Sequence, residues 1–214
     1  MRYDLHIHTK YSRCSALQPA RILKIAKKKK LDGIAITDHN TVRGALAVNK
    51  LNKDPDFEVV VGSEMKSEYG DVLIYYQNEE IKTRNFLELI DAVKQQGAML
   101  AVAHPFRIVP WLKFKLPLKN LVGKVDAVET FNSRNAFWSN TIATKEAKKY
   151  GFAGVGGSDA HWPFDIGNGY TIFRDNLIKA IKTKQTEVGG TTYMVGLSAI
   201  LSTVQSRIIY PIFS

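Results

Sequence analysis

The sequence has 214 residues, of which 45% are hydrophobic and 23% are charged. That length and balance suit one globular domain with a full core and exclude disordered and collagenous chains. Thirty Lys and Arg residues outweigh twenty Asp and Glu residues, and the formal net charge of +10 favours an anionic partner such as a phosphate ester, a nucleotide, nucleic acid or an acidic membrane surface.

A single cysteine, Cys14, excludes an intrachain disulfide framework. No basic segment followed by an apolar segment opens the chain, so we expect a cytoplasmic protein rather than a secreted one. The apolar residues 193–214 are interrupted by Gln205, Arg207 and Pro211, whereas a membrane-spanning helix needs about 20 continuous apolar residues. We therefore expect no membrane span, and we assign residues 1–190 to the folded domain and residues 191–214 to a C-terminal tail of unknown role.

Short β-branched apolar runs alternate with amphipathic windows along the chain. The runs predict strands at Tyr3–His8, Gly33–Thr37, Glu58–Gly62, Val72–Tyr76, Met99–Ala103, Val125–Phe131, Ala153–Gly157 and Tyr170–Phe173. The windows predict helices at Pro19–Lys30, Val42–Leu51, Asn85–Gln96, Trp138–Tyr150 and Asn176–Lys184. Repeated βα units imply a parallel sheet, and about seven such strands in about 190 residues predict a single-domain α/β barrel, TIM-barrel-like but smaller than the usual eightfold one.

All five histidines lie at or just after the carboxyl end of a predicted strand, each within a short polar cluster. The clusters are Asp4-Leu5-His6-Ile7-His8, Thr37-Asp38-His39-Asn40, Ala103-His104-Pro105 and Gly157-Ser158-Asp159-Ala160-His161, and a fifth strand end supplies Gly62-Ser63-Glu64. In a parallel barrel these ends gather on one face, where the active site lies. We therefore expect the five segments to converge.

The spacing of these residues favours metal binding. His6 and His8 are two residues apart on a strand, so they point to the same side and can reach one ion, and Asp159 and His161 repeat this spacing. Imidazole nitrogens and carboxylate oxygens are ligands for Zn²⁺, Mn²⁺ and Fe²⁺. A lone histidine beside a strand is more often an ordinary core or surface residue, but five together indicate a site for two or three divalent ions.

These motifs resemble those of the PHP (polymerase and histidinol phosphatase) domain family of metal-dependent phosphoesterases. The resemblance covers residues 2–184 through the segments DLHIHTKYS, GIAITDHNT, VVGSEM, LAVAHPFR, VDAVETFNSRN and GVGGSDAH, in this order. It implies a distorted (β/α)7 barrel that holds up to three divalent ions. It also implies three sets of ligands: His6, His8, Glu64 and Asp159 for the first ion, Glu64 and His104 for the second, and His39 and His161 for the third.

The sequence departs from the family pattern at two places. Many members have an acidic S-D-G after the H-x-H threonine, whereas residues 12–14 read S-R-C, so the third ion lacks a carboxylate. Cys14 offers a thiolate as a replacement, but we interpret it as an inert buried thiol. Asp71 stands where a histidine often follows G-x-E, and it is either a substitute ligand for the second ion or a turn carboxylate. Asp38 is either a ligand or a group that orients His39.

The resemblance implies phosphoester hydrolysis by a metal-activated hydroxide, since paired ions both neutralise the phosphate oxygens and generate a nucleophile near neutral pH. We take Asp159, Glu64 and Arg107 as catalytic candidates. The sequence contains no P-loop, no serine-hydrolase elbow and no dinucleotide motif. Arg107 and Arg134 are placed to clamp a phosphate, and Trp111 lies in a basic and aromatic segment, residues 106–124, that is suited to stack a base.

The leading hypothesis is a metal-dependent phosphoric ester hydrolase that acts on a small phosphomonoester or a nucleotide with two or three Mn, Zn or Fe ions. One alternative is a nuclease or phosphodiesterase acting on nucleic acid, which the net charge of +10 favours. A second alternative is a non-catalytic RNA-binding barrel, since RNase P protein subunits look like PHP barrels that have lost their metal ligands. The retained histidines and carboxylates argue against such a loss.

Overall fold

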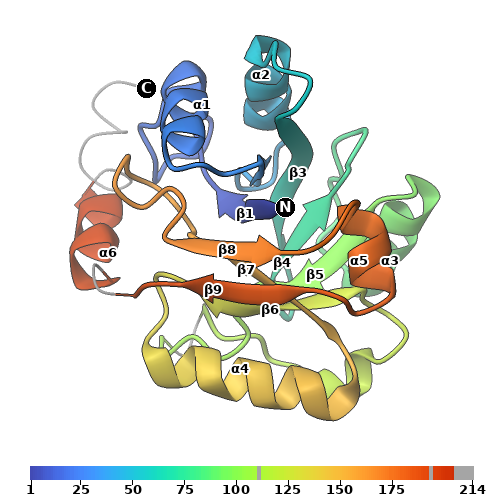
Figure 1. The fold of residues 1–214 in the computed structure, drawn as a ribbon. Helices are drawn as coiled ribbons and strands as arrows, with labels where there is room; N and C mark the ends of the chain where they lie inside the picture. The colour runs from blue at the N-terminus through green and yellow to red at the C-terminus, as the bar shows by residue number, and fades with distance from the viewer. Residues whose placement is uncertain (110–111, 193–194, 205–214) are drawn as a thin grey trace.

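The computed structural model describes residues 1–109, 112–192 and 195–204 (Figure 1). Its strands are β1 (Arg2–Ile7), β2 (Gly33–Ile36), β3 (Glu58–Ser67), β4 (Gly70–Tyr75), β5 (Met99–Val102), β6 (Ala127–Asn132), β7 (Ala153–Gly157), β8 (Gly169–Ile172) and β9 (Glu187–Gly190). Its helices are α1 (Pro19–Lys28), α2 (Arg43–Leu51), α3 (Phe86–Gln95), α4 (Phe137–Tyr150), α5 (Leu177–Lys182), α6 (Val195–Val204) and the short 3-10 helix η2 (Leu118–Leu121).

Strands β1 to β7 curl into a barrel whose first and last strands meet. The sheet has the order β7-β6-β5-β4-β3-β2-β1-β8-β9. Ile7 at the end of β1 forms a parallel bridge with Ala160, just beyond β7. The His8 amide donates to the Ala160 carbonyl at 2.9 Å, and the Ala160 amide donates to the His6 carbonyl at 3.1 Å. The single-domain α/β barrel predicted from the sequence is therefore confirmed.

The sheet is mixed, and the prediction of a parallel sheet was wrong. Strand β4 is antiparallel to both β3 and β5, and β8 is antiparallel to both β1 and β9. Strand β3 continues to Ser67 instead of ending at Gly62, so only residues 68–69 connect it to β4. A parallel neighbour needs a crossover of a dozen or more residues, and this turn is far too short for one. Strand β9 and helix α6 were not predicted.

The barrel interior is filled by one apolar cluster, to which each of the seven barrel strands contributes at least one side chain. In β5, Met99 and Ala101 belong to this interior cluster, whereas Leu100 and Val102 belong to the cluster under α3. Such alternation is the period of two that a strand covered on both faces requires. Helices α1 and α2 lie on one side of the barrel and α4 on the opposite side (Figure 1). The strands thus form a rigid frame whose carboxyl ends carry the polar residues.

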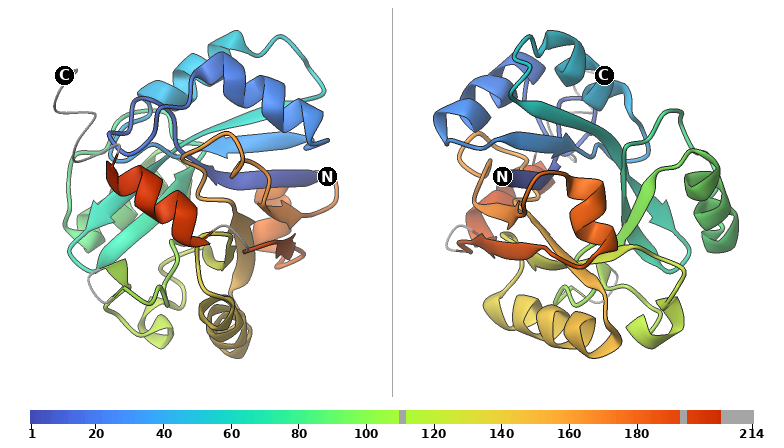
Figure 2. Two further views of the ribbon diagram at one scale, coloured as in Figure 1. Left: turned by 90° about the vertical axis from the view of Figure 1, so that its left-hand side faces the viewer. Right: turned by 45° about the vertical axis from the view of Figure 1, so that its right-hand side comes forward.

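Helix α6 lies at one end of the barrel, as two views of the ribbon show (Figures 1 and 2). This is the end at which β1 finishes, and the Arg134 guanidinium donates from Nη2 to Ser202 Oγ of α6 at 3.3 Å. Residues 191–214 thus include a helix that contacts the loop after β6. No helix in the described part of the chain is long and apolar enough to cross a bilayer.

Gly157, the last residue of β7, sits so close to β1 that a side chain has no room there. A Cβ atom at this position would lie 2.4 Å from the Cβ of His6 and 2.6 Å from its backbone nitrogen. We expect Gly157→Ala to lower the free energy of unfolding by about 1–3 kcal/mol, measured by urea denaturation, because the backbone of β1 has to shift. Gly154→Ala on the same strand is the control, since the three atoms nearest to its Cβ would all belong to the side chain of Thr130 and not to the backbone of another strand. Equal losses in the two variants would contradict this reading.

Candidate metal centre

The predicted ligand residues lie together at the carboxyl ends of β1, β2, β3, β5 and β7. They are His6, His8, His39, Glu64, His104, Asp159 and His161. All of these side chains are buried except that of His39, which is 42% exposed. The convergence of five strand ends expected from the sequence is therefore present, and His39 forms the solvent-facing edge of the cluster.

The first group of donor atoms comes from β1, β3 and the loop after β7. The Nε2 atoms of His6 and His8 are 3.1 Å apart. Glu64 Oε2 lies 3.4 Å from His6 Nε2 and 3.3 Å from His8 Nε2, and Asp159 Oδ1 lies 3.8 Å and 3.4 Å from the same two nitrogens. The donor atoms of His6, His8 and Glu64 lie within 4.8 Å of one another, and Asp159 Oδ1 lies beside both nitrogens. Imidazole nitrogens and carboxylate oxygens gathered in this way are a donor set for a divalent cation. The residues present fit such an ion.

The second group shares Glu64 with the first. Glu64 Oε1 lies 2.9 Å from His104 Nε2, and an Asp71 oxygen lies within 4.8 Å of the donor atoms of both residues. Asp71 is buried, although one of its oxygens also lies 3.6 Å from Lys66 Nζ. Asp71 therefore lies in β4 beside Glu64 and His104 rather than in a turn. The two oxygens of Glu64 thus face different groups, as a carboxylate that bridges two ions does.

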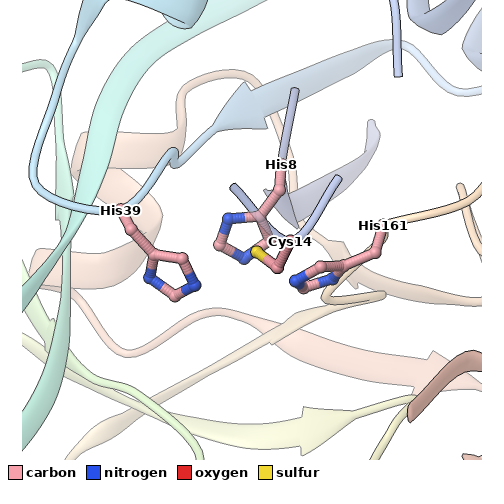
Figure 3. Close-up of side chains that lie close together, drawn as sticks. All are labelled: His8, Cys14, His39 and His161. Carbon is pink, nitrogen blue, oxygen red and sulfur yellow. The ribbon is translucent and has the colours of Figure 1, made fainter. Parts of the chain in front are cut away.

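The third group contains the cysteine. One nitrogen from each of His8, His39 and His161 and the sulfur of Cys14 all lie within 4.8 Å of one another, and the four side chains point toward a common centre (Figure 3). Cys14 is partly exposed rather than buried. The interpretation of Cys14 as a buried core thiol was wrong, because the turn after β1 brings it to the histidines.

Glu129 is part of the site, although sequence analysis did not single it out. From the middle of β6, its Oε1 accepts a hydrogen bond from His6 Nδ1 at 2.8 Å, and its Oε2 accepts from the His104 amide at 2.8 Å and from Asn132 Nδ2 at 3.1 Å. A proton held on His6 Nδ1 leaves the Nε2 lone pair free for an ion. The sequence did contain one sign of this role, because Glu129 is an acidic residue inside an apolar strand. A carboxylate in such a place is buried only when it has polar partners.

Asp38 does not belong to any of the three groups. It accepts hydrogen bonds from the Thr9 amide and the Thr9 hydroxyl, each at 2.7 Å, and from Ser12 Oγ at 2.6 Å. Ser12 Oγ in turn accepts from the His39 amide at 3.0 Å. Asp38 therefore positions His39 through the turn after β1, and it does so without touching the imidazole ring.

Two arginines reach into the cluster from the loops after β5 and β6. Arg107 donates from Nη2 to Asp159 and from Nε to Asn135 Oδ1 at 3.2 Å. Arg134 Nη1 lies 3.6 Å from Asp159 Oδ1 and 2.6 Å from His161 Nδ1. Both guanidinium groups therefore stand next to the candidate ligands, and their contact with a phosphate stays a prediction. Trp111, the predicted base contact, lies outside the described residues.

The charges of the cluster hold its carboxylates ionised. Burial raises the pKa of Asp159, but the charges of His6, Arg107 and Arg134 outweigh burial and hold that pKa well below its usual range. Burial also opposes ionisation of Glu64, and the charges of His39 and His6 likewise hold its pKa well below the ordinary value. Both groups are therefore acceptors at neutral pH, which is the state in which a carboxylate binds a metal.

The pKa values of His6, His8 and His161 shift in different directions. Burial and the charge of His39 lower the pKa of His8, and burial and the charge of Arg134 lower that of His161, so both rings are neutral at pH 7. Burial also acts to lower the pKa of His6, but the charges of Glu129 and Asp159 outweigh it and raise that pKa well above 6.5. In the absence of an ion, a proton on His6 supplies positive charge that a bound cation would replace.

Comparison with known proteins finds relatives of this chain in sequence and in fold. Two uncharacterised proteins of Methanocaldococcus jannaschii are 36% identical over 168 residues (70% of this chain and 93% of the relative) and 35% identical over 181 residues (82% and 71%). A family model described as PHP-associated matches residues 137–186. A two-domain protein of Bacteroides vulgatus, described as containing a predicted PHP-like metal-dependent phosphoesterase, has the same fold with a TM-score of 0.76 at 17% identity over 89% of this chain. This chain spans 65% of that protein's length.

The barrel has the fold of a protein described as containing a predicted PHP-like metal-dependent phosphoesterase. This shared fold and the PHP-associated family model over residues 137–186 confirm the resemblance to the PHP family found in the sequence.

Glu129 offers a test of how the imidazoles are oriented. In Glu129→Gln, the side-chain carbonyl oxygen keeps the hydrogen bond from the His104 backbone amide. The side-chain NH₂ group then faces His6 Nδ1, so this nitrogen has to accept a hydrogen bond and the His6 proton moves to Nε2. We expect the affinity for Zn²⁺ or Mn²⁺, measured by titration calorimetry, to fall roughly 10–100-fold, the usual loss for a partner of a metal-ligating histidine. Glu58→Gln is the matched control, because Glu58 accepts from the Tyr3 hydroxyl at the other end of the barrel. Unchanged affinity in Glu129→Gln would contradict the orienting role.

Proposed function

We propose that the protein is a metal-dependent phosphoesterase that hydrolyses a small phosphomonoester or a nucleotide. The observation that carries this proposal is the position of Glu64. Its Oε2 lies 3.4 Å and 3.3 Å from the Nε2 atoms of His6 and His8, while its Oε1 lies 2.9 Å from His104 Nε2. One carboxylate between two sets of imidazole donors suits a pair of ions that share a ligand.

The residues divide into two ligand sets in this proposal. His6, His8, Glu64 and Asp159 hold one ion, and Glu64, His104 and Asp71 hold the second. Divalent Mn, Zn or Fe held there supplies charge neutralisation of the phosphate and lowers the pKa of a water molecule. Glu129 keeps the imidazole of His6 turned toward the first ion. Asp38 holds the turn that carries Ser12 against His39.

Arg107 and Arg134 are the phosphate-binding groups in this proposal. Both lie beside Asp159, so their guanidinium groups border the position where a phosphate that contacts the ions would stand. A planar guanidinium binds two phosphate oxygens at once and fixes the orientation of the ester. Arg107 makes the shorter contact with Asp159 and has more surface exposed, 17% against 12% for Arg134. We therefore assign the principal phosphate contact to Arg107.

A small substrate is favoured by the position of α6. This helix lies at the ligand end of the barrel and contacts Arg134 through Ser202 (Figure 2). A nucleic acid strand would have to share that end with the helix. The net charge of +10 is the observation that favours a nuclease instead. Turnover of phosphomonoesters, nucleotides and short oligonucleotides in the presence of Mn²⁺ or Zn²⁺ distinguishes the two functions.

Removing a ligand carboxylate tests the proposed function directly. We expect Asp159→Asn and Glu64→Gln to reduce turnover of p-nitrophenyl phosphate at least roughly a hundredfold, because each loses a charged ligand of the ions that activate water. Elemental analysis should show fewer ions per chain, while circular dichroism stays unchanged. Asp54→Asn is the control, since the Asp54 side chain is 40% exposed and pairs only with Lys27 among the ion pairs of the described residues. Full activity in either ligand variant would refute the assignment.

A further inference from the structure

The family resemblance implies a third ion at His39 and His161; we infer that Cys14 is a further ligand of that ion and that its sulfur makes the position selective for zinc. This inference rests on the proposed function, because it adds an ion to the two that Glu64 serves. It concerns a residue that carries no role in the proposed hydrolysis.

The geometry of the four side chains is that of a ligand set. The ring of His8 lies with its centroid 4.5 Å from that of His39 and 4.3 Å from that of His161, whereas the outer two rings are 6.5 Å apart. The Cys14 sulfur lies within 4.8 Å of a nitrogen of each ring. Figure 3 shows the thiol between His39 and His161 with the rings turned toward it. Three nitrogens and one sulfur at this spacing are the donors of a tetrahedral ion.

The turn that carries Cys14 is fastened to the same three histidine segments. Ser15 Oγ donates to the carbonyl of His8 at 3.2 Å and to the carbonyl of His161 at 3.0 Å. On the other side of Cys14, Ser12 Oγ accepts from the His39 amide at 3.0 Å. The two serines therefore hold the thiol at a fixed place relative to all three rings. A cysteine that only filled space would not need this arrangement, and Cys14 is not buried.

His8 determines whether the third position is closed or open. Its Nε2 lies 3.3 Å from Glu64 Oε2 and 3.4 Å from Asp159 Oδ1, so it belongs to the first group as well. A neutral imidazole binds one ion through one nitrogen. When His8 serves the first ion, the third ion keeps Cys14, His39 and His161 and has one free coordination position. Three protein ligands with one open position is the arrangement of catalytic zinc, whereas four protein ligands mark a structural site.

The sulfur sets the preference for zinc. The first two groups contain the carboxylates of Glu64, Asp159 and Asp71, which suit Mn²⁺ as well as Zn²⁺. The third group replaces a carboxylate with a thiol, and a thiolate is a soft ligand that favours Zn²⁺ over Mn²⁺ or Mg²⁺. Ionisation of Cys14 accompanies binding of the ion, since the thiolate is the form that ligates. The centre thus combines two positions whose ligands include carboxylates, which are hard ligands, with one position whose ligands include a soft thiolate.

Cobalt substitution tests the inference on the full chain. Purified protein is stripped of metal and titrated with Co²⁺ without oxygen. Because Cys14 is the only cysteine in the sequence, a thiolate-to-cobalt charge-transfer band in the near ultraviolet identifies that residue alone. We expect the band in the wild type and its loss in Cys14→Ser, with Zn²⁺ affinity of that position lowered at least roughly tenfold. His104→Gln is the matched control: it removes a ligand of the second group, so it should lose an ion and keep the band.

A second measurement covers the case in which Cys14→Ser does not fold. Wild-type protein is treated with iodoacetamide with and without Zn²⁺, and labelling of Cys14 is followed by mass spectrometry. We expect saturating Zn²⁺ to slow labelling and equimolar Mn²⁺ to leave it unchanged. Equal protection by the two ions would overturn the zinc selectivity.

The outcomes separate this inference from the proposed function. If Co²⁺ binds and supports activity but gives no charge-transfer band, Cys14 is not a ligand and the phosphoesterase proposal stands. Binding of no ion at all by the wild type would overturn both. Retention of the band in Cys14→Ser would show that its source is not the thiol and would also overturn the inference.

Discussion

The contact between β1 and β7 is the constraint on which the rest of this molecule depends. Two backbone hydrogen bonds through Ala160 join strands that are about 150 residues apart in the chain. They place His6 and His8 against Asp159, and the absence of a side chain at Gly157 allows the strands to come this close. The contacts of His6 and His8 with Asp159 depend on that closure. Closure of the barrel therefore brings strand ends that are distant in the sequence close together in space.

The cluster is stable because its buried charges compensate one another. Asp159 and Glu64 are ionised and almost inaccessible, a state that costs several kcal/mol for an unpaired ion. Arg107 donates to Asp159, and His6 lies within ion-pair distance of both carboxylates. Removal of one partner would leave the others buried without compensation. This explains why imidazoles, carboxylates and guanidinium groups occur together at one end of the barrel.

Local pattern was sufficient to predict most of the fold and the polar strand ends that converge. Apolar runs and the polar residues that follow them are short-range features, so the five converging segments could be located from sequence. The direction of β4 could not, because it depends on how far β3 continues past Gly62. Glu129 was hidden inside an apolar strand, and its role exists only once His6 and His104 lie beside it. Cys14 was misread because its exposure is set by a turn.

Glu64 links groups that are otherwise separate. Its Oε2 faces His6, His8 and His39, and its Oε1 faces His104, so each of these imidazoles interacts with the same carboxylate. Residues that share a partner show energetic coupling, and the effects of their substitutions do not add. The ligand cluster therefore behaves as one epistatic unit. Its evolution, or its redesign toward another metal, has to proceed through concerted replacements around Glu64 rather than through independent single steps.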